Sequence, residues 1–560
     1  MNITYDFPPP QPKNKYVAID LEIFGMNKKT LHRPTSGTFA CMTIATEPDE
    51  VYITEHVCNI ETMLKSISDC IWVFHNAKFD LTQLRRWVDV PPRKTLWDTL
   101  LIERILWGGY FSLFGLDQLA RRYLDVKVDK SLQKSWEKAT EITPELLEYA
   151  ATDASITLQI CEAQRKIMTK DDFRIWSEVD RPALWSILDF KGMAIDVDSW
   201  LTLAKSNKEH AEEIDKQLSF NPNSPKQVVD NLTKTGFKGL PNSQEGTLET
   251  FIKKFPKSDA ARLSEMILER RAFGKRASTY GAKFITDHLE QDNGVNILFS
   301  DWHIVGAESG RMSSSDPALQ TIPARETKDF RKCFIARPGN KIIVVDYSAQ
   351  EPRITAYLTQ DKKLMSIFQS GKDIYCEMAR EIFGETIEKS DPRRAQMKSL
   401  ILGAIYGLSK WGLSKKENID VETAEELLNH FFRLFSGIKA WADKQQRNKK
   451  LVRTVMGRKC WLNPYSSQVE RNALNFSIQG TAGDMTKRAL GLIHKDWNFP
   501  IPFGLVAVIH DEIVADVPEQ YAHDVAQFIS AKMIEAADAI CPGIPWKVEF
   551  AIGENWSIKN

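Results

Sequence analysis

Three absences narrow the class of this 560-residue chain before any motif is considered. The chain has no uninterrupted apolar run of membrane-spanning length, and its polar, proline-rich N-terminus has no apolar core of a secretory signal. Its eight cysteines are scattered without a CxxC pair, so neither a zinc module nor a disulfide framework is indicated. We expect an intracellular protein with reduced thiols and no membrane partner. Its expected location is the cytoplasm, which would be that of the host cell for a viral protein.

The chain also has no excess charge of either sign, because 74 basic residues balance 74 acidic residues. Binding of polyanions through overall charge is therefore not indicated. Basic residues are nevertheless concentrated in residues 268–276, 391–398, 443–453 and 457–459. The charges of local basic surfaces and of separate acidic sites could cancel in the net charge of the chain.

The length exceeds what one hydrophobic core can organise and predicts two or more domains. Residues 16 to about 165 have the pattern of an α/β unit, with the strands YVAIDLEI and IWVFHNAKF followed by helices. Residues from about 170 to 290 are mainly helical, and FNPNSPKQ (220–227) predicts a loop that enters a helix. A helical block is expected from about 361 to 454, and a long helix at 469–497. No internal repeat or low-complexity tract is present.

Acidic residues stand where apolar strands end in the C-terminal half. The segment LVAVIHDEIVADV predicts a β-hairpin with His510, Asp511 and Glu512 at its tip, and KIIVVDYS ends at Asp346. Acids brought together beside buried strands repel one another unless a cation neutralises them. The two strand-end aspartates therefore predict one divalent-metal site.

A second group of acids lies in the N-terminal unit. Asp20 and Glu22 leave the same face of a strand, Asp80 follows the next strand, and Tyr149 and Asp153 share a helix face. Each acid alone could be a helix cap or a surface charge. Four converging carboxylates would suit Mg²⁺ or Mn²⁺, and a two-metal cluster can activate water against a phosphodiester. Tyr149 could orient that water.

A basic and aromatic stripe runs along the predicted helix DPRRAQMKSLILGAIYG. Arg394, Lys398, Leu402 and Tyr406 recur every four residues and so share one helix face. The cations could meet a triphosphate and the aromatic ring a base. An amphipathic helix with solvated basic residues is the alternative for an isolated RxxxK pattern.

Polar residues follow on two further segments. Arg471, Asn475 and Gln479 form a stripe that could donate to minor-groove acceptors, which are similar for all base pairs. Arg311 and Gln320 lie in the turn-rich segment SGRMSSSDPALQTIP, which suits a backbone or groove contact. A polar solvent face is the alternative for the stripe.

In this collinear order the motifs resemble DNA polymerase family A, the relatives of the large fragment of bacterial DNA polymerase I. The N-terminal motifs AIDLE, HNAKFD and YAATD resemble the tyrosine-containing DEDD 3′→5′ exonucleases. The resemblance covers nearly the whole chain. The polymerase motifs that carry it are RPALWSILDFKGMAID, FNPNSPKQ, SGRMSSSDPALQTIP, VVDYSAQEPR, RRAQMKSLILGAIYG, VIHDE and the final GENW.

The resemblance implies an α/β and α+β multidomain fold: an RNase H-like DEDD exonuclease domain followed by a right-hand polymerase. The expected exonuclease domain is 1–165 and the polymerase domain 166–560. Within the latter, a thumb is expected at about 196–300, a palm with an antiparallel sheet at about 301–360 and 467–560, and helical fingers at about 361–466.

The resemblance also implies template-directed DNA synthesis by two-metal transfer to a primer 3′-hydroxyl, with 3′→5′ proofreading. Primer–template DNA and dNTPs are the expected partners of a monomeric enzyme. Each site would hold two Mg²⁺ ions, which Mn²⁺ could replace. The implied metal ligands are Asp346, Asp511 and the Tyr347 backbone in the polymerase site, and Asp20, Glu22, Asp80 and Asp153 in the exonuclease site.

The remaining roles follow residue by residue. Lys398 and Arg394 would bind the triphosphate, with Lys398 also a proton donor, while Tyr406 would pack near the templating base. Glu351 would crowd the 2′ position of the sugar, and Glu512 would support Asp511. The implied nucleotide site also includes Leu402, Tyr375 and Gln350, and the implied DNA contacts are Arg311, Gln320, Arg471, Asn475, Gln479 and His510.

The chain departs from the family pattern beside these residues. DYSAQEPR differs from the usual DYSQIELR at Ala349, Gln350 and Pro352, and proline is tolerable there if a helix begins near Ser348. Leu402 stands where an aromatic residue is usual and Tyr375 where histidine is frequent. We therefore expect altered sugar discrimination.

Alternatives from other classes remain. The C-terminal region of a 3′→5′ exonuclease could merely bind DNA, or the chain could be a replication scaffold, although neither acidic site is eroded. Single-subunit RNA polymerases have a palm that works in the same way, but they lack this exonuclease domain. We expect no 5′-nuclease domain, and no long thumb insertion of the kind that recruits a processivity factor.

Overall fold

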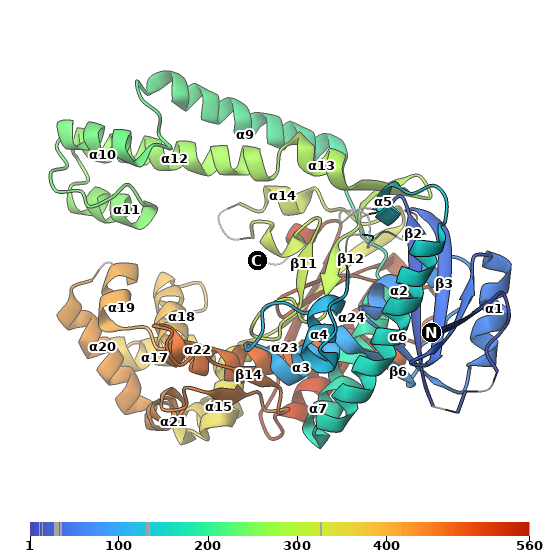
Figure 1. Ribbon diagram of the computed structural model, residues 1–560. Coiled ribbons are helices and arrows are strands. Elements are labelled where there is room, and N and C mark those ends of the chain that lie inside the picture. The colour runs from blue at the N-terminus through green and yellow to red at the C-terminus, as the bar shows by residue number, and fades with distance from the viewer. Residues whose placement is uncertain are drawn as a thin grey trace.

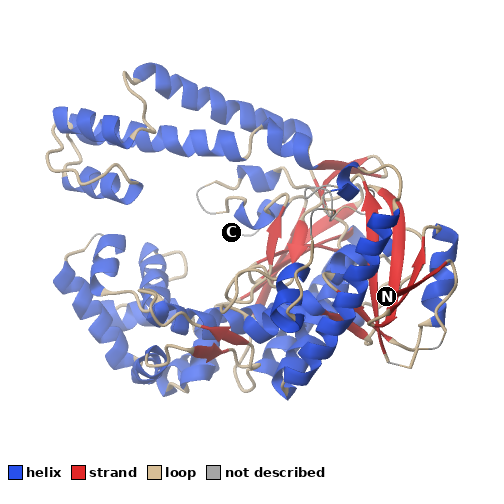
Figure 2. Cartoon of the chain, in the orientation of Figure 1, coloured by secondary structure: helices blue, strands red, loops and turns tan. Residues whose placement is uncertain are grey.

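Two sheets from distant parts of the sequence organise the fold (Figures 1 and 2). The computed structural model describes residues 1–10, 12–13, 15–26, 33, 36–129, 132, 135–324, 327–417 and 419–558. One sheet has six strands in the order β1-β4-β3-β2-β5-β6, and the other has four in the order β15-β16-β12-β17. No helix among these residues is long and apolar enough to cross a membrane.

The N-terminal sheet confirms the predicted α/β unit and extends it. The two predicted strands are β2 (Tyr16–Phe24) and β5 (Ile71–Phe74), which pair in parallel. The structure adds four strands that the sequence pattern does not predict: β1 (Asn2–Tyr5), β3 (Thr38–Glu47), β4 (Glu50–Thr54) and β6 (Leu96–Asp98). The helices of this unit are α1 (Val57–Ser66), α2 (Ala77–Leu84), α3 (Thr99–Trp107), α4 (Leu116–Leu124), α5 (Ser135–Lys138) and α6 (Pro144–Ile167).

The predicted helical region follows and projects from the rest of the molecule. The long helices α9 (Val197–Gln217) and α12 (Asp259–Thr279) lie side by side, green in Figure 1. The predicted loop-to-helix entry is confirmed, because Ser224 caps α10 (Pro225–Lys234) and Pro225 occupies its first turn. Other helices here are α7 (Lys170–Ile175), the π-helix η1 (Trp176–Asp180), α8 (Arg181–Leu188), α11 (Glu245–Lys254) and α13 (Ala282–His288).

The C-terminal sheet contains the predicted hairpin. β15 (Leu505–Ile509) and β16 (Glu512–Pro518) are antiparallel, and His510 and Asp511 form the turn between them. β12 (Asn340–Tyr347) pairs with β16 on one side and with β17 (Val548–Gly553) on the other, so Asp346 lies opposite Glu512. α24 (Ala522–Ile540) packs on β12 and β17. These pairings draw strand ends more than 160 residues apart into one sheet.

Short elements connect the helical arm to this sheet. They are β7 (Met193–Ala194), β8 (Leu289–Asp292), β9 (Val295–Leu298), β10 (Asp301–His303), β11 (Ser313–Ser315), the 3₁₀ turn η2 (Leu319–Thr321) and α14 (Asp329–Lys332). Further 3₁₀ turns, η4 (Glu519–Tyr521) and η5 (Trp556–Ile558), flank α24 and end the described chain.

The second helical block is confirmed between β12 and the hairpin. Its members are α15 (Gln350–Thr359), α16 (Lys362–Gln369), α17 (Ile374–Phe383), α18 (Pro392–Ile405), α19 (Lys410–Glu417), α20 (Val421–Leu434) and α21 (Ser436–Gln446). A two-stranded hairpin of β13 (Leu451–Arg453) and β14 (Lys459–Trp461) follows.

The predicted single long helix at 469–497 is wrong in detail. The chain runs through α22 (Val469–Asn475), a π-helical turn η3 (Phe476–Gly480) and α23 (Thr481–Lys495). A π turn holds one extra residue, which periodicity counted at 3.6 residues per turn does not reveal. The helix axis continues through η3, but the side chains before and after this turn are offset by one residue from the positions that a regular α-helix would give them.

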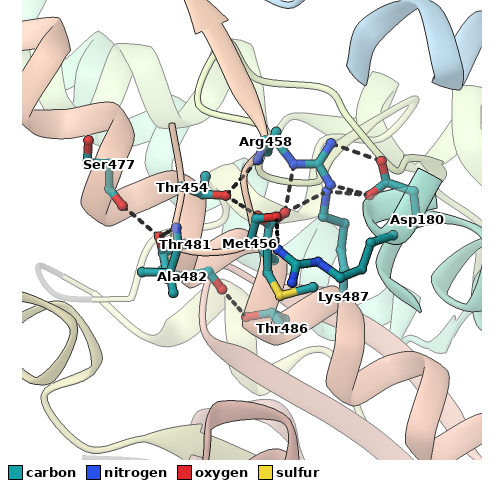
Figure 3. A network of polar contacts seen from close by, with 12 residues as sticks. Asp180, Thr454, Met456, Arg458, Ser477, Thr481, Ala482, Thr486 and Lys487 are labelled. Carbon is teal, nitrogen blue, oxygen red and sulfur yellow. Dashed lines mark hydrogen bonds and ion pairs between the residues drawn. The ribbon is translucent and has the colours of Figure 1, made fainter. Parts of the chain in front are cut away.

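A buried ionic network joins these parts of the chain (Figure 3). The Arg458 guanidinium donates to Asp180 at 2.7 and 2.9 Å and to Asp484 at 2.7 Å. Lys487 donates to Asp180 at 2.7 Å, and the Thr454 hydroxyl donates to Asp484 at 2.8 Å. Buried charges are tolerable only when paired and hydrogen-bonded in this way. The network therefore fixes the β13–β14 hairpin to α23 and to the end of η1.

Candidate active sites

The two strand-end aspartates open onto one cavity. Asp346 ends β12, Asp511 lies in the β15–β16 turn, and both line a cavity of about 530 Å³. Across it stands α18, whose Arg394, Lys398 and Leu402 line the same space. The structure thus brings together the acids and the basic stripe that the sequence separates by about 50 to 120 residues.

Asp511 and Glu512 differ in their surroundings although they are neighbours. His510 adopts a left-handed conformation (φ 61°) at the turn, and burial raises the pKa of Asp511. The Glu512 carboxylate accepts a 2.7 Å hydrogen bond from the Trp556 indole and lies 3.7 Å from the Arg331 guanidinium. Burial raises the pKa of Glu512, while Trp556 and Arg331 oppose that rise. Glu512 is therefore anchored to the chain's end, and Asp511 borders the cavity.

Arg394, in the first turn of α18, is held by an ion pair. Asp391 caps the helix and Pro392 occupies its first turn. Arg394 forms a 2.7 Å ion pair with Asp373, which itself caps α17. The Tyr375 ring lies near both cations, 5.1 Å from the Arg394 guanidinium and 6.0 Å from the Lys398 ammonium.

Asp373 belongs to the site and was missed by the sequence reasoning. It lines the cavity and pairs with Arg394, but in sequence it resembles an ordinary N-cap two residues before Tyr375. Glu549 and Lys547 of the β17 region were missed too. They line the same cavity and form a 2.9 Å ion pair, and the β12–β17 register puts Glu549 opposite Asp346. No motif in the sequence marks these three residues.

The residues beside the expected sugar position form a second cluster. The Arg311 guanidinium donates to the Glu351 carboxylate at 2.7 Å and forms an ion pair with it. Burial, then the Glu351 charge, raises the pKa of Tyr406, the residue that ends α18. Gln350 is buried, and its amide donates to the Ala482 carbonyl at 3.4 Å, a contact with α23.

Pro352 fits its unusual place because α15 begins at Gln350, two residues beyond the Ser348 start considered from sequence. As the third helical residue, Pro352 lacks only an amide that has no intrahelical partner. Ala349 precedes the helix in a left-handed conformation (φ 54°), so the departure from the family pattern sits in a tight strand-to-helix turn.

The expected DNA contacts lie at several places around the two cavities. Asn475 and Gln479 line the second cavity, of about 530 Å³, and the buried Asn475 Oδ1 has no hydrogen-bond partner. Arg471 is exposed one turn earlier on α22. Gln320 donates to the Val508 carbonyl at 3.2 Å and so ties its loop to β15. His510 lines the polymerase cavity, where burial and Arg311 lower its pKa.

The N-terminal acids converge from three elements. Asp20 and Glu22 lie on β2, Asp80 on α2, and Tyr149 and Asp153 on α6, which packs against β2. Burial and then repulsion from the neighbouring acids raise the pKa of Asp20 and of Glu22 well above the usual range. Burial also raises the pKa of Asp80, although its carboxylate accepts the Leu21 amide at 3.1 Å. Burial and the adjacent Asp153 raise the pKa of the Tyr149 phenol.

Both acidic sites have the chemistry of a hard-cation site. Their acids supply oxygen ligands, and the raised pKa values of Asp20, Glu22, Asp80 and Asp511 report carboxylates that lack enough positive charge nearby. Within the described ranges, no three His, Cys, Asp or Glu side chains already stand in a metal-holding arrangement. A cation would therefore have to draw the repelling carboxylates together.

Comparison with known proteins assigns both halves of the chain. The model of DNA polymerase family A matches residues 199–558, and a 3′-5′ exonuclease model matches residues 11–169. DNA polymerase I of Aquifex aeolicus is 27% identical over 545 residues, covering 91% of this chain and 92% of the relative. DNA polymerase I of Pseudomonas aeruginosa is 28% identical over 522 residues, 86% of this chain, but this chain spans only 56% of it. For the thermostable DNA polymerase I of Thermus aquaticus, 29% identical over 417 residues, the chain spans 48%.

A solved structure supports the same fold. The POL domain of Pol1 from M. smegmatis, in complex with DNA primer-template and dNTP, superposes with a TM-score of 0.81 at 22% sequence identity. The match covers 97% of this chain and 95% of that one. Domains of these two families generally use divalent metals, in keeping with both carboxylate sites. The chain belongs to DNA polymerase family A and carries a 3′-5′ exonuclease domain.

Proposed function

We propose that this protein is a DNA-directed DNA polymerase that extends a primer 3′-hydroxyl with dNTPs and proofreads through its 3′→5′ exonuclease. One observation carries the proposal: Asp346 and Asp511 share a cavity with Arg394 and Lys398. Acids that hold metal ions and cations that hold a triphosphate are the two parts that nucleotidyl transfer requires. A region that only binds DNA would need neither in this arrangement.

The metals we propose are two Mg²⁺ ions in each site, with Mn²⁺ as a substitute. In the polymerase site Asp346, Asp511 and the Tyr347 carbonyl would hold them, and in the exonuclease site Asp20, Glu22, Asp80 and Asp153. When bound, the ions would make a hydroxyl or water more acidic and neutralise the charge on phosphate oxygens.

The side chains around the polymerase cavity then have distinct tasks. Arg394 and Lys398 bind the triphosphate, and Lys398 gives a proton to the departing pyrophosphate. Arg394 is now paired with Asp373, so triphosphate oxygens would compete with that carboxylate. Tyr375 adds a phenol beside both cations where histidine is frequent in the family. Its hydroxyl can donate one hydrogen bond to a phosphate oxygen.

Selection of the nucleotide falls to the cluster at Glu351. The Glu351 side chain excludes a 2′-hydroxyl by crowding and by offering it no free partner. Tyr406 packs where the templating base enters. The primer terminus and the nascent pair are contacted by Arg311, Gln320, His510, Asn475, Gln479 and Arg471. These contacts check the shape of the base pair rather than its sequence.

The exonuclease works with a separate set of groups. Tyr149, whose phenol lies beside the Asp153 carboxylate, orients the attacking water against the scissile phosphodiester. We assign residues 1–165 to this domain and 166–560 to the polymerase. Within the polymerase, the thumb is about 196–300, the palm about 301–360 and 467–560, and the fingers about 361–466. We propose that it acts on primer–template DNA as a monomer.

Primer extension with dNTPs or rNTPs tests this function. Wild type should extend a primer with dNTPs and degrade it when dNTPs are withheld. Asp346→Asn should abolish extension and keep degradation, whereas Asp20→Ala should do the reverse. Extension that survives Asp346→Asn would refute the assignment. Degradation without extension by wild type would favour an exonuclease whose C-terminal region only binds DNA.

A further inference from the structure

Apart from Arg471, a basic segment of the chain has no role in the function proposed so far. Between residues 443 and 472 there are eight basic residues and two acidic ones. The structure places this segment at the end of α21, through the β13–β14 hairpin and into α22. Arg447, Lys449, Lys450 and Arg453 are exposed around the turn that enters β13. One of the two acids, Glu470, is already paired with Lys449 at 3.0 Å.

Aromatic rings lie beside this basic turn, and they come from two domains. Trp461 ends β14 and stacks on Trp107 of α3, with ring centroids 5.7 Å apart and an angle of 24° between the rings. Tyr110 contacts Trp461 edge-on at 6.0 Å, yet 61% of Tyr110 is exposed. Tyr465, in the loop after β14, is 95% exposed. Large aromatic residues are usually buried, so two exposed ones near one groove point to a ligand.

Hydrogen bonds and a close backbone approach fix the contact between the exonuclease loop and the β13–β14 hairpin. The Trp461 amide donates to the Gly108 carbonyl at 2.8 Å, and the Trp461 indole donates to the Leu106 carbonyl at 3.1 Å. Gly109 has φ 81°, and a Cβ there would lie 2.4 Å from the Trp461 carbonyl oxygen. Only glycine allows this approach. These backbone contacts at Gly108 and Gly109 therefore hold the neighbouring Tyr110 against the polymerase half of the chain.

The groove next to these rings leads to the polymerase site. The cavity of about 530 Å³ that contains Asn475 and Gln479 is also lined by Gly109 and Trp461. Burial of Asn475 Oδ1 without a partner indicates that this groove takes a hydrogen-bond donor. The Gln479 side chain lies close to the Tyr406 phenol at the end of α18 and opposes the rise in the pKa of that phenol. A strand that leaves the nascent base pair can therefore pass along this groove to the exposed rings.

We propose that this surface, defined by Tyr110, Trp461, Tyr465 and the basic turn 447–453, binds the single-stranded template ahead of the templating base. Exposed rings can stack only on unpaired bases, because the faces of paired bases are covered by their neighbours. The basic turn would follow the phosphates. The template is favoured over a displaced strand because only the template is continuous with the base in the polymerase site. The inference rests on the proposed polymerase function.

Equilibrium binding of primer–template DNA tests the inference. Duplexes with the same paired region and template 5′ overhangs of one or eight nucleotides are compared by fluorescence anisotropy without dNTP, with Ca²⁺ in place of Mg²⁺. For wild type we expect the longer overhang to bind about tenfold more tightly, because each stacked base contributes a measurable gain. The double variant Tyr110→Ala/Tyr465→Ala should lose most of that gain and keep its affinity for the short overhang. The Tyr→Phe pair should keep the gain.

A matched control and two further readouts separate the possible outcomes. Tyr5→Ala removes an exposed tyrosine from the edge of the N-terminal sheet and should leave the gain unchanged. Arg453→Ala should lower the salt dependence of long-overhang binding by about one phosphate contact. 2-Aminopurine three nucleotides ahead of the templating base should be quenched by wild type and not by the double alanine variant. An unchanged gain in that variant would overturn the inference, while extension of a short-overhang primer by wild type would show that the polymerase function itself stands.

Discussion

Arg311 and Glu351 form an ion pair, with the Arg311 Nη2 2.7 Å from the Glu351 Oε1. The pair joins a residue expected at the primer terminus to the residue expected to exclude ribonucleotides. Both side chains are about four-fifths buried, so the pair is screened less than a surface pair. A substitution at either position should therefore disturb both tasks.

A double-mutant cycle measures this coupling. Glu351→Ala should raise rNTP incorporation relative to dNTP by at least about tenfold, because the crowding side chain is gone. Arg311→Ala should lower dNTP incorporation, and part of that loss should vanish in the Glu351→Ala background, where Arg311 has no pair to lose. Single-turnover rates for the four proteins give the coupling, and strictly additive effects would show that the pair has no role in nucleotide selection.

Replacement of Leu402 tests the departure on α18. Leu402 lines the polymerase cavity one turn beyond Lys398 and offers bulk without a ring face. Leu402→Phe should change discrimination against sugar analogues such as dideoxynucleotides, with Leu402→Met as the volume-matched control. Steady-state competition between dNTP and ddNTP measures it. Equal discrimination in Leu402→Phe and wild type would show that this position does not face the sugar.

The two hairpin acids should differ in importance. Asp511→Asn should reduce the extension rate by about three orders of magnitude or more, since a metal-holding carboxylate is lost. Glu512→Gln should cost only about tenfold, because the Trp556 indole can donate to the amide oxygen as it does to the carboxylate. Rapid-quench extension at saturating dNTP separates the two. A loss in Glu512→Gln as large as in Asp511→Asn would make the two acids equal partners.

The buried ionic network around Arg458 should contribute strongly to the free energy of unfolding. Arg458→Leu leaves Asp180 and Asp484 buried with fewer partners and should cost about 3 to 5 kcal/mol. Urea unfolding followed by tryptophan fluorescence measures the loss. Lys495→Leu, at a side chain that is 75% exposed, should change stability by less than about 0.5 kcal/mol. Similar midpoints for the two variants would contradict a structural role for the network.

His303 gives stability a dependence on pH. Burial, then the nearby Lys78 and Arg104, lowers the pKa of His303 to about 4, below its usual 6.5. The folded state therefore binds this proton less readily than the unfolded chain, so its contribution is present above pH 6.5 and is lost as the pH falls toward 4. His303→Gln should remove about 1 kcal/mol of that acid loss, since the side chain is partly exposed. Urea midpoints at pH 7 and 4.5 test it, and equal acid losses in both proteins would contradict it.

The sequence predicts the two acidic sites because each depends on local patterns. Asp511 is visible where two apolar runs meet, and Asp20 and Glu22 share a face by strand alternation alone. The Arg311–Glu351 and Arg394–Asp373 pairs could not be predicted, because such pairs depend on distances between elements that no local pattern fixes. β3 was missed although it is long, since its run TFACMTIATE is buried on both faces and lacks clean alternation.

The π turn at Phe476–Gly480 holds one residue more than a regular α turn does over the same rotation. If one residue were deleted there, the helix could close into regular α geometry, and α22 would keep nearly the same phase relative to α23. A deletion within α23 has no such reserve, because each residue of a regular α-helix turns the chain by about 100°. Asn475 would then swing out of its groove, so this helix tolerates the loss of a residue at the π turn and not beside it.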